Sequence, residues 1–312
     1  MDKRELIKRS LDTSNAMIST AAEATAVNPN IWDMKLREFQ QANLVLTPQA
    51  EQFDFRGPGT DYRVTIDEEP SAASSLVETT DISVSKFSTR KVTFDPKEYG
   101  AGYQVTRKEA VRAFFDVAER MTKKLGYSLA LKKDNLAYSL LRDSANSTIF
   151  PNSVSEASSL SSTDVLDYET INKANRLIEK EKYQPVDAFL SYNHKEQLLN
   201  EEKVHKADNF GTRSAIAQGL LGTLFGLRLW ISHSVVSSTT ADTDTDVEYA
   251  IVAGQTGTGE KAFGYAIKRD PMIEREYHAR GRYWDIVAHE EYDFQMLHPK
   301  AVVAIGTYVA SE

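Results

Sequence analysis

The sequence predicts an α+β fold, because its apolar residues follow a helical spacing in some segments and strict alternation in others. An apolar residue recurs every three or four positions over residues 106–142, which predicts a long helix. Alternation after residue 60 predicts a pair of strands, and further strand-like segments lie at 248–254, 262–268, 273–279, 284–296 and 300–306. Because the two patterns interleave along the chain, we expect helices and strands to share a core.

The composition is typical of an ordinary folded protein: of 312 residues, 41% are hydrophobic and 26% are charged. The formal net charge of -8 argues against a protein that grips nucleic acid through a basic surface. The absence of cysteine excludes disulfides, thiolate metal sites and cysteine nucleophiles. The first residues lack the apolar segment of a secretory signal, and we expect synthesis in the cytoplasm.

The first 43 residues carry two short amphipathic patterns, at 3–19 and 30–43, joined by an Ala/Thr-rich stretch. Pieces of this length bury too little apolar area to fold alone. We therefore expect them to lie either on their own domain or on a neighbouring molecule.

The next segment has the pattern of a two-stranded ribbon. One strand carries Tyr62, Val64 and Ile66 on one face, and the second runs from Ile82 and Val84 to Val92 and Phe94. The middle of the second strand, "SVSKFSTRK", is polar on both faces. Such a ribbon cannot pack a face on its own core, so we expect it to project into solvent or onto a partner.

The long helix has a predicted start. Thr106 and Glu109 have the spacing of a capping box, in which each side chain accepts a hydrogen bond from the other residue's backbone N–H. The helix would span on the order of 55 Å over residues 106–142. Its apolar stripe comprises Val111, Phe114, Phe115, Ala118, Met121, Leu125, Leu129, Leu136 and Leu140.

After the helix, the Ser/Asn-rich residues 144–164 are predicted to be a linker between lobes. A helix near 167–182, the strand "VDAFLSY" and a short helix follow. The short helix has Asn193 at the expected cap and Glu196 three residues later.

The sequence offers motifs for nucleotide and metal chemistry but completes none of them. Glu260 stands where a phosphate-binding loop needs Lys, and a strand-like segment follows where a dinucleotide fold needs a helix. No two histidines have the spacing of zinc ligands on a helix, and Asp293 replaces the second His after His289-Glu290-Glu291. We therefore expect no catalytic, cofactor-binding or metal-binding residue, and no cofactor.

Three longer stretches carry a family resemblance: "GLLGTLFGLRLWIS" at 219–232, "KYQPVDAFLSYNHKEQLL" at 182–199 and "HPKAVVAIGT" at 298–307. Their order after the ribbon and the long helix resembles the major capsid proteins of tailed double-stranded DNA viruses, which have the HK97-like capsid fold. Read this way, Gly219, Gly222 and Gly226 are folding signals at turns with positive φ, and not ligand contacts.

The resemblance implies a division of the chain into known parts. Residues 1–55 would be an N-terminal arm and 56–97 an extended β-hairpin loop. The peripheral domain would comprise 98–164 and 261–296, with a spine helix at 106–142. The axial domain would comprise 165–260 and 297–312.

The same resemblance implies a structural protein, not an enzyme. It would assemble in the host cytoplasm into hexamers and pentamers of an icosahedral shell, the capsid of the virion. The shell would enclose double-stranded DNA without sequence-specific binding and without a membrane. Portal, scaffold and decoration proteins are the expected partners. Two alternatives stay open: the shell of an encapsulin-type cellular compartment, and a soluble α+β enzyme whose site the sequence does not reveal.

The resemblance also implies contacts between the extended loop of one subunit and a turn at 279–285 of the next. The turn has no Asn to accept a lysine cross-link of the kind that some relatives form, so we expect none. Instead the arginines of the turn would pair with acidic residues near the loop. The candidates for inter-subunit contact are Lys86, Arg90, Lys91, Arg280, Arg282, Glu68 and Glu69.

Overall fold

The computed structural model of the protein describes residues 44–68, 88–112, 117–200, 220–235, 238–239 and 246–309. The predicted helical pieces at 3–19 and 30–43 lie outside these ranges. The chain forms two compact units. The smaller unit contains Gly102–Leu125 and Ile273–Ala288 with Met1–Gln40, and the larger contains Gln41–Ala101, Gly126–Met272 and His289–Glu312.

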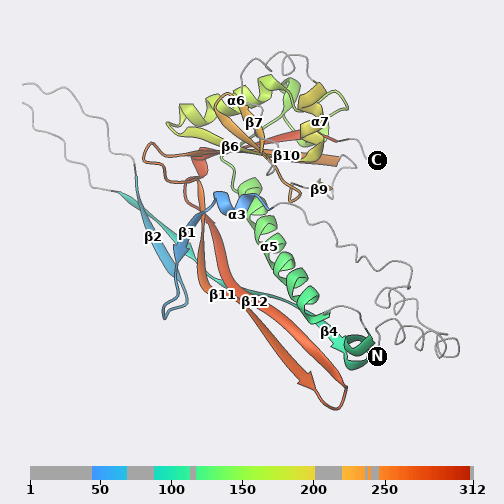
Figure 1. The fold of residues 1–312 in the computed structure, drawn as a ribbon. Coiled ribbons are helices and arrows are strands. Elements are labelled where there is room, and N and C mark those ends of the chain that lie inside the picture. The colour runs from blue at the N-terminus through green and yellow to red at the C-terminus, as the bar shows by residue number, and fades with distance from the viewer. Residues whose placement is uncertain are drawn as a thin grey trace, which may run out of the picture. The chain divides into compact units, whose positions relative to one another are not determined.

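A seven-stranded mixed sheet lies in the larger unit (Figure 1). In spatial order its strands are β5 (Ser147–Ile149), β13 (Val302–Tyr308), β10 (Asp246–Gln255), β6 (Gln184–Leu190), β8 (Leu227–Ile231) and β7 (Leu220–Leu224), with β9 (Ser238–Thr239) paired to β10. β10 is antiparallel to both β13 and β6, whereas β5 and β8 run parallel to their inner neighbours. The predicted strands at 248–254 and 300–306 are confirmed as two adjacent central strands.

Helix α6 (Tyr168–Lys180) packs on β13, β6 and β10 of this sheet (Figure 1). It begins at Asp167, whose side chain accepts a hydrogen bond from the Thr170 backbone N–H at 2.8 Å. Its buried face includes Ile171, Ala174 and Ile178, none more than 1% exposed. Burying each of the two isoleucines stabilises the fold by about 1.5–3 kcal/mol.

Helix α7 (Tyr192–Asn200) begins two residues earlier than its sequence signal predicts. Ser191, not Asn193, is its cap: Ser191 Oγ accepts from the His194 backbone N–H, and His194 Nδ1 accepts from the Ser191 backbone N–H, both at 3.1 Å. This is a capping box in which an imidazole takes the place of the usual Glu. The prediction of Asn193 with Glu196 is therefore wrong, because His is not among the residues by which such a box is recognised.

The Ser/Asn-rich residues 144–164 are ordered, and the expectation of a plain linker is wrong for them. Residues 147–149 form β5, which pairs with β13. Asp164 accepts hydrogen bonds from the Asn152 amide and the Ser161 backbone and hydroxyl, and these bonds lower the pKa of Asp164. Short 3₁₀ turns lie at Pro151–Ser153, Ala157–Ser159 and, before β13, Pro299–Ala301.

The predicted long helix is present as α4 (Arg107–Arg112) and α5 (Val117–Asp143). The capping box is confirmed, since Glu109 Oε2 accepts from the Thr106 backbone N–H at 2.9 Å and Thr106 Oγ1 accepts from that of Glu109 at 3.3 Å. Leu125 and Leu129 of the predicted stripe are buried. Val111 is 76% exposed, so its place in that stripe is wrong. The side chains of Phe114, Phe115 and Ala118 lie outside the described part of the chain.

A four-stranded sheet has the order β1 (Glu51–Asp54), β11 (Phe263–His278), β12 (Tyr283–Met296) and β4 (Lys97–Thr106). The two strands predicted at 262–268 and 273–279 are one continuous strand that passes through Pro271. Burial is uneven along β11: Phe263–Ala266 are buried, whereas residues 269–277 are exposed.

The ribbon forms as predicted at its root. β2 (Tyr62–Asp67) pairs with β3 (Thr89–Phe94) in antiparallel register, with Val64 opposite Val92. Phe94 is fully buried, and its ring lies 5.5 Å from Phe53 and 6.1 Å from Tyr62, measured between centroids. The part of the second strand with Ile82 and Val84 lies outside the described residues. The root of the ribbon thus packs one face into a small apolar cluster that it shares with Phe53 of β1, Ala266 of β11 and Leu297.

The glycine-rich stretch is a β-hairpin, with β7 and β8 joined at Phe225 and Gly226. Both turn residues have positive φ, 54° and 82°, as a tight hairpin turn requires. Gly226 is thus the folding signal that the sequence suggests. Gly222 lies inside β7, beside a register shift, and has no positive φ, so the prediction is wrong for it. Gly219 lies outside the described residues.

Candidate functional site

The residues that resemble a nucleotide loop form a turn. β10 ends at Gln255, Gly259 takes a φ of 90°, and the Gly259 backbone N–H donates to the Thr256 carbonyl at 2.9 Å. The chain then enters β11 instead of a helix, so no helix N-terminus is available there for a phosphate. Within the described ranges, no group of three or more His, Asp or Glu side chains could hold a metal ion. No helix among the described residues is long and apolar enough to cross a membrane.

A Ser, a His and a Glu do meet in the structure, but inside the fold. His194 is completely buried, with its Nε2 2.7 Å from Thr307 Oγ1. Glu248, also buried, accepts hydrogen bonds from Ser191 Oγ and from the Asn193 amide. Burial lowers the pKa of His194 to about 3, which keeps the ring neutral. Because no substrate can reach these atoms, the network serves to tie α7 to β10 and β13.

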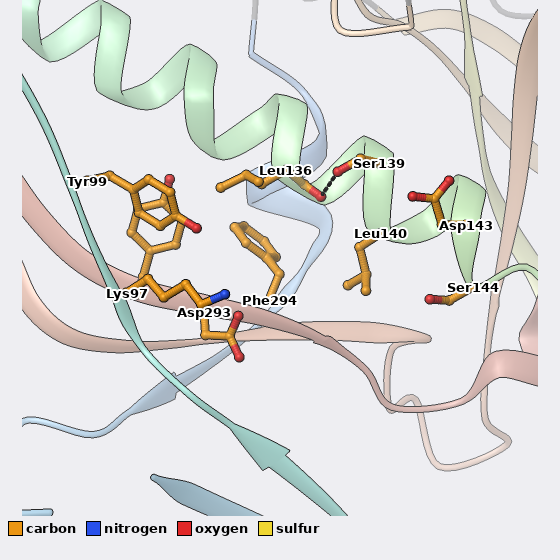
Figure 2. Close-up of a pocket in the computed structure, with 10 residues that line it drawn as sticks. Lys97, Tyr99, Leu136, Ser139, Leu140, Asp143, Ser144, Asp293 and Phe294 are labelled. Atoms are coloured by element: carbon orange, nitrogen blue, oxygen red, sulfur yellow. Dashed lines mark hydrogen bonds between the residues drawn. The ribbon is translucent and has the colours of Figure 1, made fainter. Parts of the chain in front are cut away.

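A small pocket of about 270 Å³ opens between α5, β4 and β12 (Figure 2). Leu136, Leu140 and Phe294 supply apolar side chains, and Lys97 and Asp293 supply charge. The Asp293 carboxylate already accepts from the Asp95 backbone N–H at 2.9 Å and from the Gln295 amide at 2.8 Å. The volume lies at the lower limit for a ligand pocket, and its polar groups do not converge on one point, so it has the features of a surface hollow.

The predicted contact residues near the ribbon differ in what they do. Arg90 donates through Nη2 to the Leu297 carbonyl, which holds the root of the ribbon to the segment before β13. Glu68 accepts from Ser88 Oγ across the ribbon. Lys91 is exposed. Lys86 and Glu69 lie outside the described residues.

The other two candidates lie on the exposed turn between β11 and β12. Arg282 has a φ of 56°; its backbone N–H donates to the His278 carbonyl at 2.8 Å, and its carbonyl accepts from the Arg107 backbone N–H at 2.9 Å. Both arginine residues are exposed. Among the described residues, no hydrogen bond or ion pair is found for the guanidinium of Arg280 or Arg282. The backbone fixes this turn and leaves two positive charges available.

Exposed apolar side chains gather on the strands that form this hairpin and on their neighbour β4. On β11, Met272 is 48% exposed, Ile273 45% and Tyr277 42%; Val287 on β12 is 41% exposed and Tyr103 on β4 is 42% exposed. We call these five residues the exposed strand surface. Because Met272 and Ile273 are adjacent in a strand, they point to opposite faces, and both faces of β11 are open here. Sequence reasoning missed this surface; the signal was a strand-like segment, "RDPMIEREY", with apolar and charged residues on both faces.

Comparison with known proteins gives a consistent answer. A family model described as "Phage capsid protein" matches residues 89–305. No curated protein matches the sequence.

Solved structures resemble the fold over nearly the whole chain. A structure from Mycobacterium phage Che8 has a TM-score of 0.66 at 18% identity and covers 89% of this chain and 96% of its own. The capsid of Ralstonia phage GP4 has a TM-score of 0.69 at 13% identity, covering 91% and 96%. The capsid of cyanophage P-SCSP1u has a TM-score of 0.67 at 14% identity, covering 94% and 96%.

Proposed function

The chain belongs to the phage capsid protein family, and we propose that it builds the closed icosahedral shell of a tailed virus from hexamers and pentamers of itself. It is a structural, shell-forming protein with the HK97-like fold. The observation that carries the proposal is the extent of the family match, which runs from the second strand of the ribbon to β13. An encapsulin-type compartment is not better supported than a viral capsid.

The domain boundaries of the capsid fold are part of the proposal. Residues 1–55 are the N-terminal arm and 56–97 the extended loop. The peripheral domain comprises 98–164 and 261–296 with the spine helix, and the axial domain comprises 165–260 and 297–312. The capsid-like order of elements supports this division.

Assembly contacts use surfaces that a lone subunit leaves open. The exposed strand surface has both faces of β11 available for apolar contact with another copy. Arg280 and Arg282 pair with Glu68 and Glu69 of a neighbouring subunit, and Lys86, Arg90 and Lys91 lie at the same junction. Each exposed ion pair adds little, about 1 kcal/mol or less, so the pairs set register more than affinity.

The shell encloses double-stranded DNA without reading its sequence. A net charge of -8 supports weak binding to phosphate, since tight, sequence-independent binding needs clustered Lys and Arg. Portal, scaffold and decoration functions come from separate chains, and assembly takes place in the host cytoplasm. The chain itself catalyses no reaction in this proposal.

Electron microscopy of the purified full-length chain, alone and co-expressed with its genomic neighbours, tests the proposal. We expect closed shells with fivefold vertices, and DNA-filled particles when the packaging genes are present. Discrete monomers under all conditions, or shells filled with an enzyme cargo, would contradict the proposal. A denaturing gel of boiled particles should show a single band near 35.0 kDa, because no cross-link is expected.

A further inference from the structure

The helix α3 (Leu46–Gln49) is only four residues long, and its position needs an explanation. A helix of one turn is not stable alone, because the entropy lost in nucleating it exceeds the free energy gained from its few hydrogen bonds. Its first cap position, Val45, offers no side-chain hydrogen bond. Val45 and Leu46 are nevertheless buried, in the same apolar cluster as Ala137 and Leu141 of α5. The helix is therefore held by contacts from distant parts of the chain.

The N-terminal end of α3 is capped by Asp134, which lies on α5. The backbone N–H groups of Val45, Leu46 and Thr47 donate to the Asp134 carboxylate at 2.7, 3.2 and 2.8 Å. Thr47 Oγ1 donates to the same carboxylate. Asp134 is fully buried, so these four donors replace its hydration. A negative group also suits the positive end of a helix.

The C-terminal end of α3 is capped by Lys261, which lies just before β11. Its Nζ donates to the Pro48 carbonyl at 3.3 Å and to the Ala50 carbonyl at 3.2 Å. The Lys261 backbone N–H donates to Glu51 Oε2 at 3.4 Å, which continues the attachment into β1. Burial lowers the pKa of Lys261. A positive group suits this end of the helix, as a negative group suits the other.

The two caps have a geometric result that apolar packing alone would not give. Apolar contacts tolerate small slides and rotations, whereas hydrogen bonds to particular N–H and C=O groups fix the register. The caps come from α5 and from the start of β11, so α3 is fixed to two separate elements. The backbone at Leu44 and Val45 is then held at a defined point and in a defined direction.

We propose that Asp134 and Lys261 form a two-ended clamp on α3 that fixes how residues 1–43 leave the folded body, and that correct shell assembly requires this clamp. The inference rests on the proposed function, because it takes residues 1–43, the part of the proposed arm (1–55) that precedes α3, to meet another copy. Asp134 and Lys261 are positioning residues: they hold α3 and make no contact with a partner themselves.

The absence of cysteine makes a direct test possible, since two introduced cysteines can be spin-labelled specifically. The label sites are Ala42→Cys, before α3, and Ser128→Cys, on an exposed position of α5. Distances between the labels are measured in the full-length subunit well below its unfolding temperature. Shell yield is measured by sedimentation and electron microscopy, both for the labelled chain and for a chain without cysteines.

We expect Asp134→Asn to broaden the distance distribution and lower shell yield about tenfold, an ordinary size for coupling between two parts of a protein. Lys261→Met, which keeps the aliphatic stem and loses the donors, should act in the same direction. The Lys261→Met variant still tests the clamp if the Asp134→Asn variant fails to fold. The matched control is Asp143→Asn, an exposed carboxylate on the same helix, which should change neither quantity.

The possible outcomes distinguish a clamp that positions α3 from residues that only stabilise the subunit. If the clamp variants lose shells while the distance distribution stays narrow, or broaden it without any loss of shells, the proposal is wrong. If the unsubstituted chain forms no shells, the proposed function fails first. In that case, comparing the label distances of the native subunit with those of the clamp variants still shows whether the two caps fix the backbone before α3.

Discussion

Two strand segments of this protein differ strongly in solvent exposure: β13, and residues 269–277 of β11, which we call its outer half. Each residue from Val302 to Ile305 of β13 is at most 1% exposed, with β5 and β10 on either side and α6 against the sheet. Residues 269–277 of β11 are exposed, including Met272, Ile273 and Tyr277. Both segments are regular strands: β13 pairs with β5 and β10, whereas β1 pairs with residues 264–267 of β11, which leaves β12 as the neighbour of residues 269–277 in the sheet order.

The difference shows that backbone pairing, which forms a strand, does not require the side-chain burial that forms a core. Backbone pairing with neighbours is enough to hold the outer half of β11 extended, although little of it is buried. The core of the larger unit comes from strands such as β13, whose side chains are apolar on both faces. A subunit that leaves apolar side chains open on a long hairpin is suited to burying them against other copies.

The largest expected effect is at β13. Val303→Asp places a carboxylate at a position that is 1% exposed and should destabilise the subunit by several kcal/mol, because a buried charge without a partner is costly. Urea unfolding followed by circular dichroism measures the loss. A midpoint close to that of the unsubstituted chain would mean that β13 is not a core strand.

Acid should weaken the same sheet through His194. Its folded pKa of about 3 lies below the unfolded value of 6.5, so its contribution to stability is complete above pH 6.5 and is lost as the pH falls toward 3. The loss is about 1.4 kcal/mol per pH unit in that window. The measurement is the stability difference between the native chain and His194→Gln, which should shrink with acid; a constant difference would contradict the assignment.

A smaller effect is expected at the β7–β8 turn. Gly226→Ala should cost about 1 kcal/mol, because a residue with a Cβ is strained at a φ of 82°. No atom lies within 4 Å of the added Cβ, so strain is the whole cost. Gly257→Ala is the matched control, since Gly257 has equally open space and no positive φ, and its unfolding midpoint should not change. Equal midpoints for the two variants would show that the turn does not depend on glycine.

The ribbon should affect assembly and not folding. Replacing residues 68–88 with a two-residue Asn-Gly turn keeps the pairing of β2 with β3 and every buried apolar residue of the described core. The far-ultraviolet circular dichroism should stay close to that of the native chain, while stable shells are lost. Loss of the fold itself would mean that the ribbon packs on its own subunit beyond the root.

The smallest effect on the subunit is expected on the exposed strand surface. Ile273→Asp should change the unfolding free energy by no more than about 0.5 kcal/mol, as exposed substitutions usually do. Shell yield should nevertheless fall, because the charge would be buried on assembly. If Ile273→Asp greatly lowers the unfolding free energy of the subunit, or leaves the shell yield unchanged, then the outer half of β11 is not an exposed assembly surface that differs from the core strand β13.

Local signals in the sequence were enough for most of the fold. The Thr106–Glu109 box, the helix near 167–182 and the strands at 248–254 and 300–306 each depend on residues close together in the chain, and each is present as predicted. The α+β class followed from these signals, and the resemblance to capsid proteins came from the order of the elements along the chain.

The parts that sequence reasoning missed depend on residues far apart in the chain. Helix α3 has its caps on Asp134 and Lys261, and β5 is three residues of Ser, Thr and Ile that become a strand only because β13 lies beside them. The pattern "KKDN" around Asp134 resembles a solvated helix face, so nothing local marks a buried carboxylate. Val111 fits a helical stripe but is exposed, because periodicity alone does not establish what covers a face.

The contact candidates show the same limit. The charge of these residues and their place on turns and strands could be predicted from the sequence. Which of them form hydrogen bonds within their own subunit could not. Arg90 donates to the Leu297 carbonyl, whereas Arg282 is held through its backbone in the turn that also carries Arg280. Which of them meets a second copy depends on a partner surface that the pattern of one chain does not encode.

The position of β13 also bears on when the subunit can fold during synthesis. Val303 pairs with Ser147 on one side and with Val252 on the other, so the strand translated last among the seven lies inside the sheet. A nascent chain that has not yet released residues 302–308 from the ribosome cannot join β5 to β10. Such long-range pairing makes folding slow and late. Until residues 302–308 have been synthesised the sheet stays incomplete, which delays the entry of the subunit into a growing shell.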